Sequence, residues 1–129
     1  MSPKRTYNLA LELNEYNLSL FPEAIGKEKS DFYDAVNDRV RKAFDHLKGV
    51  LKQITVSESR LEIVWESDSS GMAHVQSIAD ILTKGNYADG VLLLELFLSE
   101  NPDDEVLLYN LGMAYSDRGN LERAIALPS

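Results

Sequence analysis

The chain has 129 residues, of which 44% are hydrophobic and 26% are charged, and its formal net charge is −8. These proportions are typical of one ordinary globular domain or two small ones, and they exclude a chain that is disordered over most of its length. The sequence contains no cysteine, which excludes disulfides, thiolate metal sites and a cysteine nucleophile.

The negative charge is concentrated in the second half of the chain. Residues 1–66 carry ten basic and eleven acidic side chains, whereas residues 67–129 carry three and ten, so the two net charges are −1 and −7. An acidic surface repels phosphate groups, so we expect no binding to nucleic acid and instead a protein or peptide partner that is apolar or basic. The alternative is that the acidity only keeps the protein dissolved.

The sequence predicts a cytoplasmic protein that does not bind membranes. No apolar run long enough for a signal peptide follows residues 1–5. The longest apolar stretch, Val91–Leu98, is interrupted by Glu95 and is too short to span a bilayer.

Alternating patterns near the N-terminus predict a β-hairpin followed by a helix. Residues 7–13 and residues 16–20 alternate between apolar and polar side chains, and a turn at Asn14 and Glu15 places the apolar side chains of both segments on one face. Apolar residues then recur at helical spacing from Phe32 to Ile54, which predicts a helix over about residues 31–53 with Ser30 as its N-cap.

A further strand is predicted over residues 60–66, where Leu61, Ile63 and Trp65 alternate with polar residues and are expected to point inward. The order predicted for residues 1–66 is therefore ββαβ, a small α+β unit with one helix on the face of a sheet. The polar segment 67–71 is predicted to be a linker to the second half.

The second half contains an internal repeat with a period of 34 residues. The segment Lys84–Tyr87 recurs as Arg118–Leu121, each copy being a basic residue, Gly, Asn and an apolar residue. Helical patterning flanks both copies, and a Gly at such a place favours the end of a helix.

Further residues carry a resemblance to a known family. In the later unit these are Leu108, Leu111, Gly112, Tyr115, Gly119, Leu121 and Ala124, and in the earlier unit Gly85, Tyr87, Gly90, Leu94 and Phe97. Their spacing resembles that of the tetratricopeptide repeat (TPR) family over about residues 72–127. The first helix of the earlier unit departs from the family's pattern, with His74, Ser77 and Ile78 at its usual apolar and small positions.

The resemblance implies an all-α array of helical hairpins over residues 72–129, with about one and a half to two units and a helix that ends at Gly119. Three units are normally needed for a stable array. We therefore favour the interpretation that the chain is the N-terminal part of a longer repeat protein and continues past Ser129. The alternative is a complete chain in which another element caps the array.

The resemblance also implies a partner-binding groove lined by the first helix of each unit. Its residues are Val75, Ala79, Leu82, Tyr109, Asn110, Met113 and Asp117. Val75 and Ala79 stand where family members that bind a C-terminal carboxylate have Lys and Asn, so we do not expect that mode of binding.

The run Val91–Leu98 is apolar in nearly every direction around a helix, which predicts that it is buried on all sides. We expect residues 1–66 to cover its outer side. The alternative cover is a second copy of the chain.

No cluster of residues predicts catalysis, a metal site or a cofactor. His46 and Asp45 are sequence neighbours on a helix, so they point to different faces and the carboxylate cannot orient the imidazole. His74 has no second metal ligand four residues away. The acidic residues 103–105 follow Pro102 at a predicted helix start, where capping explains them.

The sequence thus predicts a non-catalytic interaction module, an adaptor or scaffold that holds another protein. Two alternatives stay open. One is a homodimer formed through the apolar helix 91–98 or through a sheet edge, and the other is a small-molecule sensor or enzyme site within residues 1–66.

Overall fold

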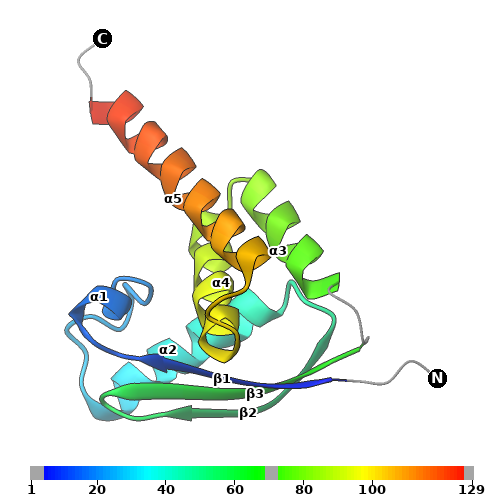
Figure 1. The fold of residues 1–129 in the computed structure, drawn as a ribbon. Coiled ribbons are helices and arrows are strands. Elements are labelled where there is room, and N and C mark those ends of the chain that lie inside the picture. The colour runs from blue at the N-terminus through cyan, green and yellow to red at the C-terminus, as the bar shows by residue number, and fades with distance from the viewer. Residues whose placement is uncertain (1–4, 69–72, 127–129) are drawn as a thin grey trace.

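The structure is a computed structural model that describes residues 5–68 and 73–126, with side chains for residues 5–68 and 74–116. It combines a three-stranded antiparallel sheet with five helices, a mixed α+β fold (Figure 1). In chain order the elements are β1 (Thr6–Glu12), α1 (Glu15–Leu18), α2 (Lys29–Phe44), β2 (Gly49–Val56), β3 (Arg60–Ser67), α3 (Ala73–Thr83), α4 (Tyr87–Glu100) and α5 (Glu105–Ala126).

The sheet has the strand order β1-β3-β2. The prediction for β3 is confirmed, because Leu61, Ile63 and Trp65 are buried and alternate with more exposed residues. Trp65 lies opposite Tyr7 of β1 and Leu51 of β2, so the core side of the sheet is built from cross-strand apolar pairs. The predicted linker begins later than expected, since Ser67 still belongs to β3, and its residues 69–71 lie outside the described part of the chain.

The predicted hairpin over residues 7–20 is wrong. β1 pairs with β3, which lies far away in the sequence, and residues 15–18 form the short helix α1. The Asn14 side chain accepts a hydrogen bond from the backbone N–H of Asn17 at 2.8 Å and so caps this helix. A local side-chain cap thus overrides the alternation of apolar residues that follows it.

The long helix predicted over residues 31–53 is also wrong in its second half. Helix α2 begins at Lys29 with Glu28 at the N-cap position instead of Ser30, and it ends at Phe44. Residues 49–56 form β2, whose apolar side chains pair with β3 rather than continuing the helical stripe. A Cβ atom on Gly49 would lie 2.5 Å from the backbone oxygen of Glu66, so the close approach of the two strands requires glycine there.

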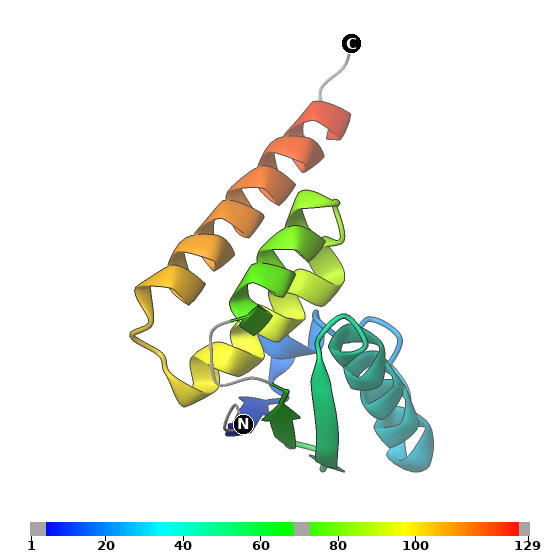
Figure 2. The same ribbon diagram turned by 90° about the vertical axis from the view of Figure 1, so that its right-hand side faces the viewer.

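Helix α4 lies at the centre of the molecule. It contacts β1 and α2 on one side and α3 and α5 on the other (Figures 1 and 2). Every residue of Val91–Leu98 except Glu95 is buried, so the prediction that residues 1–66 cover the outer side of this run is confirmed. One continuous cluster of buried side chains includes residues from both halves of the chain.

Helix α5 does not end at Gly119, as the sequence predicted, but continues to Ala126. In the earlier copy of the repeat, Gly85 has φ +85° and separates α3 from α4. A helix can pass through glycine at a cost of about 1 kcal/mol relative to alanine, so glycine permits a turn without enforcing it. The second half of α5 therefore extends beyond the ends of α3 and α4 (Figure 2). Within the described residues, no helix is both long and apolar enough to cross a membrane.

Candidate interaction surface

The first half of α5 exposes more large apolar side chains than any other described element. Leu107 and Ala114 are buried against the rest of the protein. On another side of the helix, Val106, Tyr109 and Met113 have exposed fractions of 53%, 68% and 46%. We call these three residues the outer face of α5. They recur at i, i+3 and i+7, so they form one stripe along the helix.

The sequence before α5 fixes where this helix starts. The Asp104 side chain accepts hydrogen bonds from the backbone N–H groups of Val106 and Leu107 at 2.9 and 3.0 Å, which makes it the N-cap. The capping interpretation of the acidic residues 103–105 is therefore confirmed for Asp104. Within the part of the chain that the structure describes, no three potential metal ligands gather at one place.

The predicted groove residues divide into exposed and buried ones. On α5, Tyr109 and Met113 are exposed, and the Asn110 amide donates to the Val106 carbonyl oxygen of its own helix at 2.8 Å. On α3, Val75 is buried in the core.

The remaining members add little exposed surface. Ala79 and Leu82 are half-buried, and Leu82 lies against the backbone of Gly90. The side chain of Asp117 lies outside the described part of the structure. Of the predicted groove residues, Tyr109 and Met113 are thus the most accessible, and both lie on the outer face of α5.

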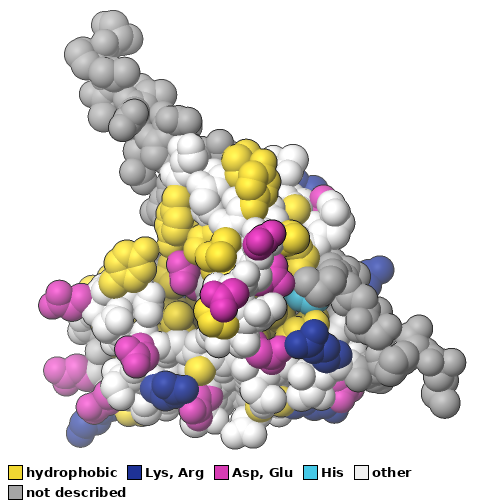
Figure 3. All heavy atoms as spheres, in the orientation of Figure 1, with side chains coloured by type: hydrophobic (Ala, Val, Ile, Leu, Met, Phe, Trp, Pro, Cys, Tyr) yellow, Lys and Arg dark blue, Asp and Glu magenta, His cyan; other side chains and the backbone are white. Residues whose placement is uncertain are grey.

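A third side of α5 faces α1. Leu108 and Tyr115 have exposed fractions of 47% and 38%, and Leu111 between them is half-buried. Figure 3 shows hydrophobic side chains gathered over α5 and across to α1. A Cβ atom added to Gly112 would have no neighbour within 4 Å, so this side of the helix is open.

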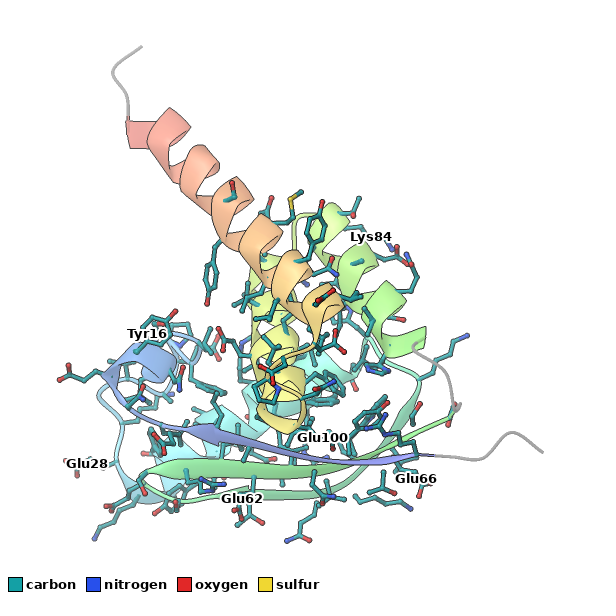
Figure 4. The ribbon with its side chains drawn as sticks, in the orientation of Figure 1. Tyr16, Glu28, Glu62, Glu66, Lys84 and Glu100 are labelled. Carbon is teal, nitrogen blue, oxygen red and sulfur yellow. The ribbon has the colours of Figure 1, made fainter. Side chains whose placement is uncertain are left out.

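Tyr16 connects α1 to that side of α5. The Tyr115 hydroxyl donates to the Glu95 carboxylate at 3.1 Å. Burial, a hydrogen bond with Tyr16 and the charge of Glu95 together raise the pKa of Tyr115 well above its ordinary value. Figure 4 shows Tyr16 projecting from α1. The sequence placed Tyr16 in a strand and carried no signal for this long-range contact.

A partly buried ionic cluster holds the start of α4 against α2. One oxygen of Asp89 accepts a hydrogen bond from Arg39, and the other lies 2.8 Å from His46 Nε2 and 2.9 Å from the side-chain nitrogen of Asn86. Burial alone would raise the pKa of Asp89, but the hydrogen bonds from Arg39 and His46 and the charge of Arg39 outweigh it, so the pKa is lowered. His46 is thus paired with Asp89 and not with its neighbour Asp45, and the cluster fastens two helices together.

Comparisons of this chain with protein-family models, with curated proteins and with solved structures found no match.

Proposed function

We propose that this protein is a non-catalytic interaction module that binds an apolar or basic peptide segment on the outer face of α5. The observation that carries the proposal is the exposure of Val106, Tyr109 and Met113 in one stripe on a helix whose opposite side is anchored in the core. Aromatic residues and methionine are enriched at protein interfaces. A rigidly held helix also presents them with little loss of conformational entropy on binding.

The charge around this stripe supports the choice of partner. Asp103 and Glu105 are exposed at the N-terminal end of α5, and residues 67–129 carry a net charge of −7. A basic segment would be attracted to this end of the helix, and an acidic one would be repelled. The attraction is expected to weaken with salt, because the acidic groups are exposed to solvent.

The finer description of the helical half, a TPR-like array of hairpins, is part of the same proposal. It is supported by the 34-residue repeat and by the α3–α4 hairpin, in which Gly85 makes the turn. In such an array, α3 and α5 are the first helices of successive units, and Val75, Ala79 and Leu82 form the wall behind the outer face of α5. The straight course of α5 through Gly119 means that the second hairpin is not closed.

Affinity capture from a lysate of the source cell tests the proposal. The wild type would be compared with a Tyr109→Ala/Met113→Ala variant and with an Ile25→Ala control, because Ile25 is also 58% exposed but lies far from α5 in the sequence. We expect a protein that the wild type and the control retain and the double variant loses. A synthetic peptide from that protein should then bind directly, and more weakly at high salt. Equal recovery by all three folded proteins would contradict the proposal.

A homodimer through the sheet edge is the second candidate, and one observation favours it. On the β1 edge, the backbone N–H groups of Asn8 and Ala10 donate to Glu100 and Ser99 at 2.9 and 3.0 Å. On the β2 edge, no hydrogen bond joins the backbone of Val50–Thr55 to any described residue outside β3. Helix residues 91–98 are interior and offer no free surface for a dimer. A solution mass that stays monomeric at high concentration would remove this candidate.

A further inference from the structure

His74 lies in the first turn of α3, enclosed by aromatic side chains. Its exposed fraction is 5%. The centroid of its ring lies 4.6 Å from that of Phe97 on α4, 5.1 Å from that of Tyr7 on β1 and 5.9 Å from that of Trp65 on β3. This one imidazole therefore joins α3 to both the sheet and the central helix.

The aromatic enclosure suits a neutral imidazole and not a charged one. Among the described residues, Nδ1 of His74 is buried and has no hydrogen-bond partner. Protonation would make both ring nitrogens donors, and a buried donor that carries charge and lacks a partner is costly. The first turn of a helix also carries a partial positive charge, which disfavours a second positive charge at the same place.

Charged groups act on His74 from the residue before β1, from α4 and from the turn before α5. These are Arg5, Glu100 and Asp104, and the hydroxyl of Tyr7 is the other titratable group. β3 contributes the uncharged Trp65. Burial, followed by the charge of Arg5, lowers the pKa of His74 below its ordinary value of 6.5, although Asp104 and Glu100 act in the opposite direction.

Neither carboxylate is free to pair with a protonated His74. Glu100 binds the guanidinium of Arg5 at 2.7 Å and accepts a hydrogen bond from the backbone of Asn8. One oxygen of Asp104 is engaged as the N-cap of α5, and the other accepts a hydrogen bond from the Asn101 amide at 3.3 Å. Protonation of His74 in place would therefore create a buried charge without a compensating ion pair.

We propose that His74 is a proton-operated latch for α3. With a neutral imidazole the first turn of α3 stays docked on the sheet and on α4, and with a protonated imidazole this turn leaves the aromatic enclosure. The latch does not depend on the interaction function proposed above, because it concerns the contact between α3 and the sheet and not the outer face of α5.

The sign of the pH effect follows from which form binds the proton more tightly. Released His74 has its ordinary pKa and binds a proton more readily than docked His74 does. Protonation therefore does not weaken docking above pH 6.5, and docking becomes progressively less favourable as the pH falls below that value. Because one proton is involved, the ratio of released to docked α3 rises by at most tenfold for each unit of pH.

Trp65 provides the readout, since it is the only tryptophan in the chain and lies against His74. Its fluorescence emission would be recorded from pH 8 to pH 5 in the full chain, together with the far-ultraviolet circular dichroism. The variants are His74→Phe, which keeps an aromatic ring, His74→Gln, and the control His46→Gln, which alters the only other histidine.

We expect the emission of the wild type and of His46→Gln to change as the pH falls below 6.5 while helix content is retained. Both His74 variants should show no such change. If a His74 variant does not fold, the NMR signals of the two histidine rings and of the α3 amides in the wild type give the same information.

Three results would overturn the latch. The first is the same emission change in a folded His74→Phe protein, and the second is its loss in His46→Gln. The third is a constant wild-type emission down to pH 5, whether or not the ring signal of His74 titrates, because α3 would then stay docked throughout.

Discussion

The two copies of the internal repeat have nearly the same turn sequence and different backbones. At Lys84–Tyr87 the chain reverses, with Gly85 at φ +85° and Asn86 capping α4, whereas at Arg118–Leu121 the helix α5 runs straight on. Three residues after the Asn, the first copy has Asp89, which Arg39 and His46 bind, and the second copy has Arg123. A Gly-Asn pair thus allows a turn, and the contacts of the residues that follow it decide whether the chain turns there.

The largest loss of stability should come from removing Asp89, whose ionic contacts exist only in the first copy of the repeat. Asp89→Ala leaves the guanidinium of Arg39 buried without its partner, and such changes cost about 3–5 kcal/mol of unfolding free energy. Urea denaturation would measure the loss. Glu62→Ala, which removes an ion pair between exposed Arg60 and Glu62, is the matched control and should cost little. If the two variants lose equal stability, Asp89 is not what stabilises the chain reversal at Lys84–Tyr87.

A second effect concerns the close packing of α4 on α3. A Cβ atom at Gly90 would lie 2.5 Å from a methyl carbon of Leu82, so Gly90→Ala should lower the unfolding free energy by about 1–3 kcal/mol. Gly112 on α5 has no such neighbour, and Gly112→Ala should instead raise it by about 0.5–1 kcal/mol through helix propensity. Thermal denaturation of both variants would show whether each is less or more stable than the wild type. Stabilisation by Gly90→Ala would mean that the α3–α4 contact is looser than described.

Replacing the Gly of each repeat copy by alanine should change the unfolding free energy in opposite directions. Gly85→Ala places a Cβ in the left-handed region and should cost about 1–2 kcal/mol, because that conformation is unfavourable for alanine. Gly119→Ala in a straight helix should gain about 1 kcal/mol. The measurement is the midpoint of urea unfolding for each. Destabilisation by Gly119→Ala would show that the second copy also turns, and would favour the array of closed hairpins.

The smallest effect should be a pH dependence of the stability that Asp89 contributes. The folded pKa of Asp89 lies below its unfolded value of about 3.8, so its contribution to stability is complete above that pH and is lost as the pH falls through the folded pKa. The difference in unfolding free energy between pH 5 and pH 3 should therefore be larger for the wild type than for Asp89→Asn. An equal difference in the wild type and in Asp89→Asn would show that protonation of Asp89 does not weaken the chain reversal at Lys84–Tyr87.

Part of the fold could be predicted because its signals are local. The inward side of β3, the junction before α5 and the burial of Val91–Leu98 follow from alternation, capping and an apolar run. The strand β2 could not be predicted in this way, because its apolar residues continue the helical stripe of α2. Only their pairing with β3 decides the conformation. The sequence predicts β1 as a strand, but its partner β3 lies 48 to 60 residues away along the chain.

The role of the predicted groove residues stays a prediction, but sequence reasoning included some that are accessible. Tyr109 and Met113 of that set are exposed, whereas Val75 is a core residue. The open side of α5 beside Tyr16 depends on how α1 meets α5 in space. No local pattern around Tyr16 encodes that meeting, so sequence reasoning could not reach it.

The cover that Glu100 and Ser99 place over β1 limits how copies of this protein could add to one another. Strand addition needs free backbone groups, and on β1 the N–H groups of Asn8 and Ala10 are already engaged. Two copies joined through their β2 strands would present a covered β1 strand at each end of the combined sheet. Growth by strand addition would therefore stop at a pair, so the same two side chains that close one edge of the sheet would also oppose the growth of fibres through that edge.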